Sequence, residues 1–213
     1  MYNYKTVFYT LGTLQIILGV FMLIPVIIQL IYSELDSGFV SASIITIIFG
    51  VLFFLSNLDH DKKIDLPQAF ILTALSWLSI AIFGSLPFIF SELNLNFTDA
   101  FFESMSGITT TGSTIITDLD NAPKGILLWR AILQWLGGIG IILMAITLMP
   151  IMNIGGMQLF KISSNDNAEK ILPNSKEVSL RLIIIYSLLT LICAFFYKLF
   201  GMNYFDSLTH SMT

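Results

Sequence analysis

The chain has 213 residues, of which 55% are hydrophobic and only 11% are charged, whereas about a quarter of the residues in a typical soluble domain are charged. This composition excludes an ordinary water-soluble domain, whose surface could not cover so many apolar side chains. The net charge of −4 is spread along the chain without a basic patch, so nucleic acid is not an expected partner. The composition therefore indicates an integral membrane protein in contact with membrane lipid.

Five apolar stretches are long enough to cross a bilayer as helices. A helix rises about 1.5 Å per residue and must cover roughly 30 Å of hydrocarbon. Pro25 and Pro87 are expected to bend the helices that contain them, because proline removes a backbone donor. The predicted spanning helices are 7–31, 39–57, 66–90, 126–149 and 178–199.

The basic residues predict the orientation of these helices. If the amino terminus is cytoplasmic, seven lysines and arginines fall inside and three outside, in agreement with the positive-inside rule. The inner ones are Lys5, Lys62, Lys63, Lys161, Lys170, Lys176 and Arg181, and the outer ones are Lys124, Arg130 and Lys198. The single cysteine, Cys193, and the absence of a paired metal-ligand motif predict no cofactor.

The segment between the third and fourth spans predicts a short helix that enters the membrane and turns back. Thr98 is a candidate N-cap, with Asp99 in the first turn of the helix. About ten residues precede a Thr-rich run, enough for about 15 Å of helix, or half a bilayer. Irregular backbone at membrane depth is tolerated only where protein buries it or where it lines an aqueous cavity. The segment therefore predicts a pore or a buried site.

An internal repeat supports this interpretation. Residues 99–106 resemble residues 206–213, and both segments follow an apolar helix at the same distance. The repeated unit is a helix, a short helix, an irregular loop and a helix, and the second copy is incomplete at Thr213. We therefore expect this chain to be the amino-terminal part of a longer protein. The predicted parts are a two-helix hairpin (1–65), a first pore unit (66–149), a cytoplasmic connection (150–176) and the start of a second unit (177–213).

The loop after the short helix contains Thr110, Thr111 and Gly112, a combination suited to binding a bare cation. Backbone carbonyls can replace the hydration shell of a monovalent ion without a full negative charge that would trap it. Gly112 can adopt a positive φ at little cost, and the threonines add hydroxyl oxygens. In a soluble protein a lone Thr-Thr-Gly is usually a turn. Its position after a half-length helix between two spans favours an ion filter here.

Three blocks of sequence identify a family resemblance: residues 101–114 (FFESMSGITTTGST), 130–140 (RAILQWLGGIG) and 155–160 (GGMQLF). In these blocks the chain resembles the TrkH/KtrB-type potassium transporters, and in particular their TrkH branch. The resemblance implies an all-α membrane fold in which two leading helices precede helix–pore-helix–filter-loop–helix units around a pseudo-fourfold pore. It also implies potassium uptake or symport across the bacterial inner membrane, with potassium as the transported ion.

The resemblance also implies site residues and partners. Thr110, Thr111 and Gly112 would line the first filter, with potassium bound at the two threonines, and Ser113 would lie at its outer lip. Independently of the resemblance, we expect Thr109, Asp99, Glu103 and Arg130 to be associated with the pore. The implied partners are a second copy of the protein, forming a homodimer, and a cytoplasmic nucleotide-binding regulatory subunit of the TrkA type.

Two further features of the helix after the loop predict contacts with its neighbours: a pair of polar residues and a group of glycines. Arg130 and Gln134 are four residues apart and share a face, and we expect Arg130 to tie its helix to Glu103 or to another acid at the mouth. Gly137, Gly138 and Gly140 permit either close helix packing or a hinge, of which packing is the simpler interpretation.

Two other functions stay open at the level of sequence. Ser106 and His210 could in principle serve as nucleophile and base of an intramembrane hydrolase, although no residue is placed to orient the histidine. A non-conducting membrane scaffold is also compatible with the sequence. His60 lies among charged residues and is interpreted as an ordinary surface histidine.

Overall fold

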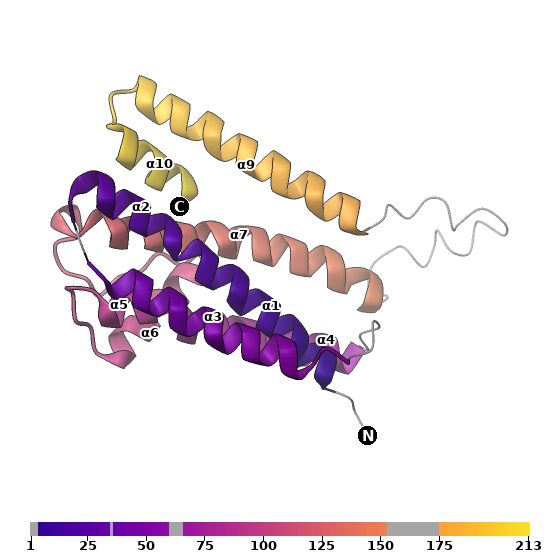
Figure 1. The fold of residues 1–213 in the computed structure, drawn as a ribbon. Coiled ribbons are helices and arrows are strands. Elements are labelled where there is room, and N and C mark those ends of the chain that lie inside the picture. The colour runs from indigo at the N-terminus through magenta and orange to yellow at the C-terminus, as the bar shows by residue number, and fades with distance from the viewer. Residues whose placement is uncertain (1–3, 35, 60–65, 153–174) are drawn as a thin grey trace, which may run out of the picture. The chain divides into compact units, whose positions relative to one another are not determined.

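The computed structural model describes residues 4–34, 36–59, 66–152 and 175–213, which form helices joined by loops with no strand among them (Figure 1). The predicted all-α class is confirmed. The chain folds as two compact units, residues 1–137 with 212–213, and residues 138–211. His60 and most of the predicted cytoplasmic connection, residues 153–174, lie outside the described residues.

All five predicted spans are present among the described residues, with ends that differ from the prediction by only a few positions. At most 39% of the residues in the most apolar window of any span are buried within the chain. The other residues of these helices are partly or fully exposed within this chain, which leaves apolar surface available for contact with lipid. The chain is therefore a multi-pass membrane protein. The spans are Lys5–Tyr32, Gly38–Ser56, Pro67–Phe90, Lys124–Ala145 and Glu177–Leu199.

The first unit contains most of the helices. Helix α3 packs along α1, and α4 packs against both α1 and α6. The second unit contains the remainder of α7 together with α9 (Ser175–Leu199) and α10 (Tyr204–Met212). The elements of the first unit are α1 (Lys5–Phe21), α2 (Leu23–Tyr32), α3 (Gly38–Ser56), α4 (Leu66–Gly84), α5 (Leu86–Phe90), α6 (Phe97–Ile108), the 3₁₀ turn η1 (Leu119–Asn121) and the first part of α7 (Lys124–Met152).

Both prolines interrupt their spans, as the sequence predicts. The first span breaks at Met22, three residues before Pro25, and the third breaks at Ser85, two residues before Pro87. At the second break the amide of Phe88 turns to Ser85, which leaves the carbonyl oxygen of Gly84 without its helical donor. The indole N–H of the fully buried Trp129 on α7 donates to this oxygen at 2.9 Å. The bend is therefore stabilised by a hydrogen bond from a neighbouring helix.

Helix α6 has 12 residues, about half the length of the spans before and after it. The prediction of Thr98 as its N-cap is wrong, because the helix begins at Phe97 and Asn96 is the cap. The side-chain oxygen of Asn96 accepts the Asp99 amide at 2.9 Å. This bond reaches the third residue of the helix, the usual target of an Asn cap. The prediction of Asp99 in the first turn is confirmed.

The glycines of α7 differ in how closely neighbouring residues approach them. A Cβ added at Gly137 would overlap the carbonyl oxygen of Ile108 at the end of α6. A Cβ added at Gly138 would lie 2.7 Å from the Tyr186 hydroxyl of α9, whereas Gly140 has open space. Close packing is therefore confirmed at Gly137 and Gly138, whereas no described residue of this chain approaches Gly140 within 4 Å.

Candidate functional site

The backbone after α6 folds back onto the last turn of the helix. The amide of Thr110 donates to the carbonyl of Gly107 at 2.9 Å, and the amides of Thr111 and Gly112 donate to the carbonyl of Ser106 at 3.0 and 3.3 Å. These bonds satisfy carbonyls that a helix end normally leaves unpaired. They also direct the N–H groups of the loop towards the helix.

The carbonyl oxygens of the same loop have no such partners. No described residue donates a hydrogen bond to the carbonyls of Thr109, Thr110 or Thr111. Residues 109–115 are exposed within this chain. The hydroxyls of Thr109 and Thr111 lie 2.9 Å apart and add two further oxygens. The loop therefore presents a group of backbone and hydroxyl oxygens that can accept a cation.

Two residues of the loop have left-handed backbone angles. Thr110 has φ of 58° and Gly112 has φ of 74°, while Thr111 between them does not have a positive φ. Glycine adopts this conformation freely, but a β-branched threonine rarely does. Such strained residues persist where the surroundings hold them, and they are common at functional sites. The contacts of Glu103 and Ser106 supply the restraint.

Glu103 is the centre of a buried polar network behind the loop. Its residue is only 1% exposed. Atom Oε1 accepts hydrogen bonds from the Thr114 hydroxyl at 2.5 Å and from the Ile115 amide at 2.6 Å. Atom Oε2 accepts the Nε–H of Arg130 at 2.9 Å. One carboxylate on α6 therefore fixes both the chain leaving the loop and helix α7.

Arg130 connects this network to the loop itself. Its side chain is 12% exposed, and its Nη2 lies 3.5 Å from the carbonyl oxygen of Gly112. A hydrogen bond to a charged group is about twice as strong as one between neutral groups, and burial protects the ion pair from screening by salt. The expectation that Arg130 ties its helix to Glu103 is confirmed. The amide of Gln134, one turn later, lies beside Gly112.

Ser106 forms a second restraint on the loop. Its hydroxyl donates to the carbonyl oxygen of Ser113 at 2.6 Å. This bond spans the loop from the end of α6 to its far side, so the loop is closed at Ser113 as well as at Thr114. The Ser106 hydroxyl is thus engaged in holding the loop.

The predicted site residues are brought together with one exception. Glu103 and Arg130 meet the loop formed by residues 109–113. Asp99 does not: its carboxylate accepts a bond from the side-chain amide of Asn96 at the start of α6. The sequence prediction missed Asn96, Ser106, Thr114 and Ile115. Only Asn96 left a signal in the sequence, because an Asn three residues before an Asp recurs at Asn203 and Asp206.

Comparison with known proteins identifies the family. Residues 36–213 match the family model TrkH, described as a cation transport protein. The chain is 39% identical to the Trk system potassium uptake protein TrkI of Halomonas elongata, over 95% of this chain and 42% of that protein. It is 37% identical to the TrkH protein of Escherichia coli K12, over 98% of this chain and 44% of that protein.

A solved structure gives the same result for the fold. The crystal structure of the potassium transporter TrkH from Vibrio parahaemolyticus matches with a TM-score of 0.87 and 34% identity, over 99% of this chain and 42% of that chain. The chain therefore spans about two fifths of the length of the relatives that it matches. These relatives are transport proteins rather than enzymes. On the family model, which covers most of its residues, the chain belongs to the TrkH family of cation transport proteins.

Proposed function

We propose that this chain supplies the first selectivity-filter loop of a potassium-uptake pore. The observation that carries the proposal is the exposed loop of residues 109–113. The carbonyls of its three threonines accept no hydrogen bond from a described residue, and the loop is attached to α6 and α7. A selectivity filter needs both properties. Carbonyl dipoles must replace the water around the ion, and their spacing must be maintained while ions pass.

Within this proposal each residue has a role. The carbonyls of Thr110, Thr111 and Gly112 are ligands of the ion, and Ser113 lies at the outer lip. Thr109 contributes its hydroxyl, which also contacts Thr111. The carboxyl-terminal end of α6 adds the negative end of the helix dipole near the ion. Glu103 and Arg130 are positioning residues: Glu103 holds the chain that leaves the loop, and Arg130 holds Glu103 and the Gly112 carbonyl.

A complete pore requires more loops than this chain contains. The relatives are more than twice as long, and α10 with its preceding helix repeats the order of elements seen at α6. We propose a pseudo-fourfold arrangement of four such units, each with its own loop. By resemblance, the whole protein acts in the bacterial inner membrane as a homodimer with a TrkA-type nucleotide-binding subunit.

The proposed orientation has the amino terminus in the cytoplasm. Lys5 at the start of α1 lies 3.8 Å from Asp59 just after α3, so these two ends share one side of the unit. The positive-inside rule assigns that side to the cytoplasm. Helix α6 then enters the membrane from outside, and the loop faces the outer mouth.

The test is potassium uptake by a transport-deficient bacterium that expresses the full reading frame. Gly112→Ser is expected to abolish rescue at low external potassium, because serine resists a φ of 74°. The matched control is Gly140→Ala, at a glycine with open space around it, which should rescue like the wild type. Equal rescue by Gly112→Ser would contradict the filter assignment. Failure of the wild type to rescue would favour the scaffold alternative.

A further inference from the structure

Ser106 contacts three successive residues of the loop that follows α6. Its carbonyl oxygen accepts the amides of Thr111 and Gly112 at 3.0 and 3.3 Å, and its hydroxyl donates to the carbonyl oxygen of Ser113 at 2.6 Å. Ser106 is only 6% exposed and lies in the last turn of α6. One buried residue therefore bonds to both N–H groups and a carbonyl group of the loop.

The hydroxyl of Ser106 does not bond to its own helix. A serine or threonine within a helix commonly donates to the carbonyl four residues earlier. Thr46 does so in α3, where its hydroxyl donates to the carbonyl of Ala42 at 2.8 Å. Ser106 instead donates to a carbonyl seven residues later, in the loop. Its hydrogen bond therefore acts on the loop rather than on α6.

This bond separates the carbonyls of the loop into two groups. The carbonyls of residues 109–111 accept no hydrogen bond from a described residue, so they are available to an ion. The carbonyl of Ser113 accepts the Ser106 hydroxyl at 2.6 Å, within the usual range of a hydrogen bond between two oxygens. Because this carbonyl is held against α6, it cannot turn freely towards an ion. The run of available carbonyls therefore ends before Ser113.

The internal repeat gives an independent indication that this hydroxyl has a role. The repeat aligns residues 99–106 with residues 206–213, which places Thr213 at the position of Ser106. In the same alignment His210 stands at the position of Glu103, the other attachment of the loop. Both copies of the repeat therefore have a hydroxyl at this position, whereas only the first has the carboxylate.

We propose that Ser106 is a positioning residue that sets the ion specificity of the loop, because its hydroxyl keeps the Ser113 carbonyl turned towards α6. This inference rests on the proposed function. The number and the spacing of carbonyl dipoles decide how well a filter replaces the water around K⁺ or Na⁺. A Ser113 carbonyl released from Ser106 can turn towards the ion and approach a smaller one more closely. Loss of the hydroxyl therefore makes Na⁺ a better competitor of K⁺.

The test is uptake of radioactive Rb⁺ by a transport-deficient bacterium that expresses the full reading frame, with K⁺ or Na⁺ added as competitor. In Ser106→Ala the Na⁺ concentration that halves Rb⁺ uptake should fall about tenfold, while the corresponding K⁺ concentration should change less than twofold. Ser106→Thr retains the hydroxyl and should behave as the wild type. A purely structural defect would lower the maximal rate of uptake without changing the ratio of the two concentrations.

Ser104→Ala is the matched control. Ser104 lies on the same helix and is fully buried, and its hydroxyl oxygen has no hydrogen-bond partner among the described residues. The same substitution at this position removes a buried hydroxyl without releasing the loop, so competition by K⁺ and by Na⁺ should match the wild type. Immunoblots of the membrane fraction measure the amount of each variant.

Ser106→Cys is the second variant if Ser106→Ala does not reach the membrane, because a thiol is a weak donor of similar size, and Na⁺ should again compete better than in the wild type. Two results would overturn the inference and leave the filter assignment intact. One is an unchanged ratio of the K⁺ and Na⁺ concentrations in these variants, and the other is an equal change in Ser104→Ala. Absence of Rb⁺ uptake by the wild type would contradict the proposed function and this inference with it.

Discussion

Helices α6 and α10 begin in the same way although they lie 107 residues apart in sequence. At the start of α6, Asn96 accepts the Asp99 amide at 2.9 Å and donates to its carboxylate at 2.6 Å. At the start of α10, Asn203 accepts the Asp206 amide at 2.7 Å and donates to its carboxylate at 2.5 Å. The cap is a local interaction, so a short stretch of similar sequence reproduces it.

The two helices differ one turn later. Glu103 in α6 is buried and bonds to Thr114, Ile115 and Arg130. The equivalent residue in α10 is His210, which is exposed and has a ring nitrogen 2.9 Å from the carbonyl oxygen of Asp206 in its own helix. The comparison teaches that the start of a pore helix is set locally, whereas the attachment of the following loop depends on one side chain with distant partners.

The largest expected effect on stability comes from removing the Glu103 side chain. Glu103→Ala leaves the Arg130 charge buried without its partner and should lower the free energy of unfolding by about 3–5 kcal/mol. The same change at the equivalent position, His210→Ala, should alter it by less than about 0.5 kcal/mol. Unfolding of the chain in mixed detergent, followed by circular dichroism, measures both. Similar losses of unfolding free energy in the two variants would mean that Glu103 stabilises the fold no more than His210 does.

A double variant separates the ion pair from the attachment of the loop. Arg130→Met combined with Glu103→Ala removes both charges and should recover about 1–4 kcal/mol relative to Glu103→Ala alone. Hydrogen exchange at the Ile115 amide should remain fast in the double variant, because its acceptor is still missing. Recovery of both stability and slow exchange would show that the loop does not need the Glu103 carboxylate.

The smallest expected loss of stability comes from removing the Asn caps that α6 and α10 share. Asn96→Ala and Asn203→Ala should each cost about 1 kcal/mol, the usual value for losing an Asn cap. Hydrogen exchange at the Asp99 and Asp206 amides reports each loss separately. Asn→Ser at either position should retain most of the protection, since serine also caps. Loss of protection at only one helix would contradict the equivalence of the two starts.

Most of the fold was predictable because it depends on local patterns. Apolar runs of sufficient length gave the five spans, and Pro25 and Pro87 gave the two breaks. The short helix before the Thr-rich loop also follows from its neighbours in sequence. The error at Thr98 has the same local origin, because two cap-forming residues lie close together and the geometry selects Asn96.

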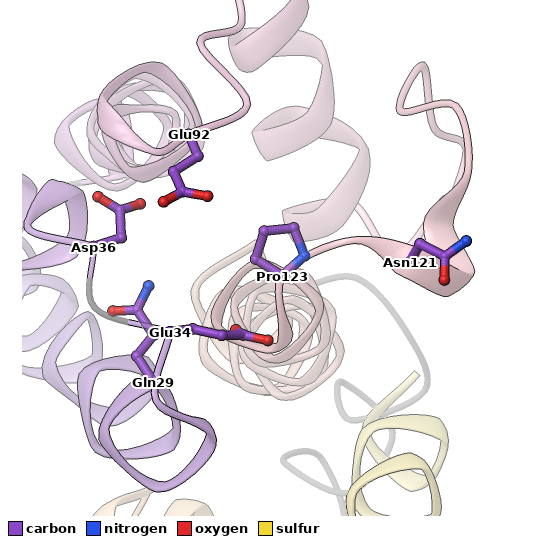
Figure 2. Close-up of a pocket in the computed structure, with 6 residues that line it drawn as sticks. All are labelled: Gln29, Glu34, Asp36, Glu92, Asn121 and Pro123. Atoms are coloured by element: carbon purple, nitrogen blue, oxygen red, sulfur yellow. The ribbon is translucent and has the colours of Figure 1, made fainter.

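The contacts that shape the candidate site were less predictable. The ion pair of Glu103 with Arg130 was foreseen, because an arginine within a membrane span needs a partner and Glu103 is an acid at the mouth. The bonds to Thr114 and Ile115 and the bond from Ser106 to Ser113 depend on the path of the loop, which no periodic pattern specifies. A cavity in the first unit likewise joins residues from separate helix ends, as Figure 2 shows: Gln29, Glu34, Asp36, Glu92, Asn121 and Pro123.

The central claim is that the carbonyls of the loop bind the transported ion. The most direct measurement is anomalous scattering from crystals of the protein, expressed from its full reading frame, grown with Tl⁺ in place of K⁺. The account predicts an anomalous peak within coordination distance of the Thr110 and Thr111 carbonyl oxygens, which disappears when Na⁺ replaces Tl⁺. Tl⁺ peaks elsewhere in the protein, with none beside these carbonyls, would contradict it.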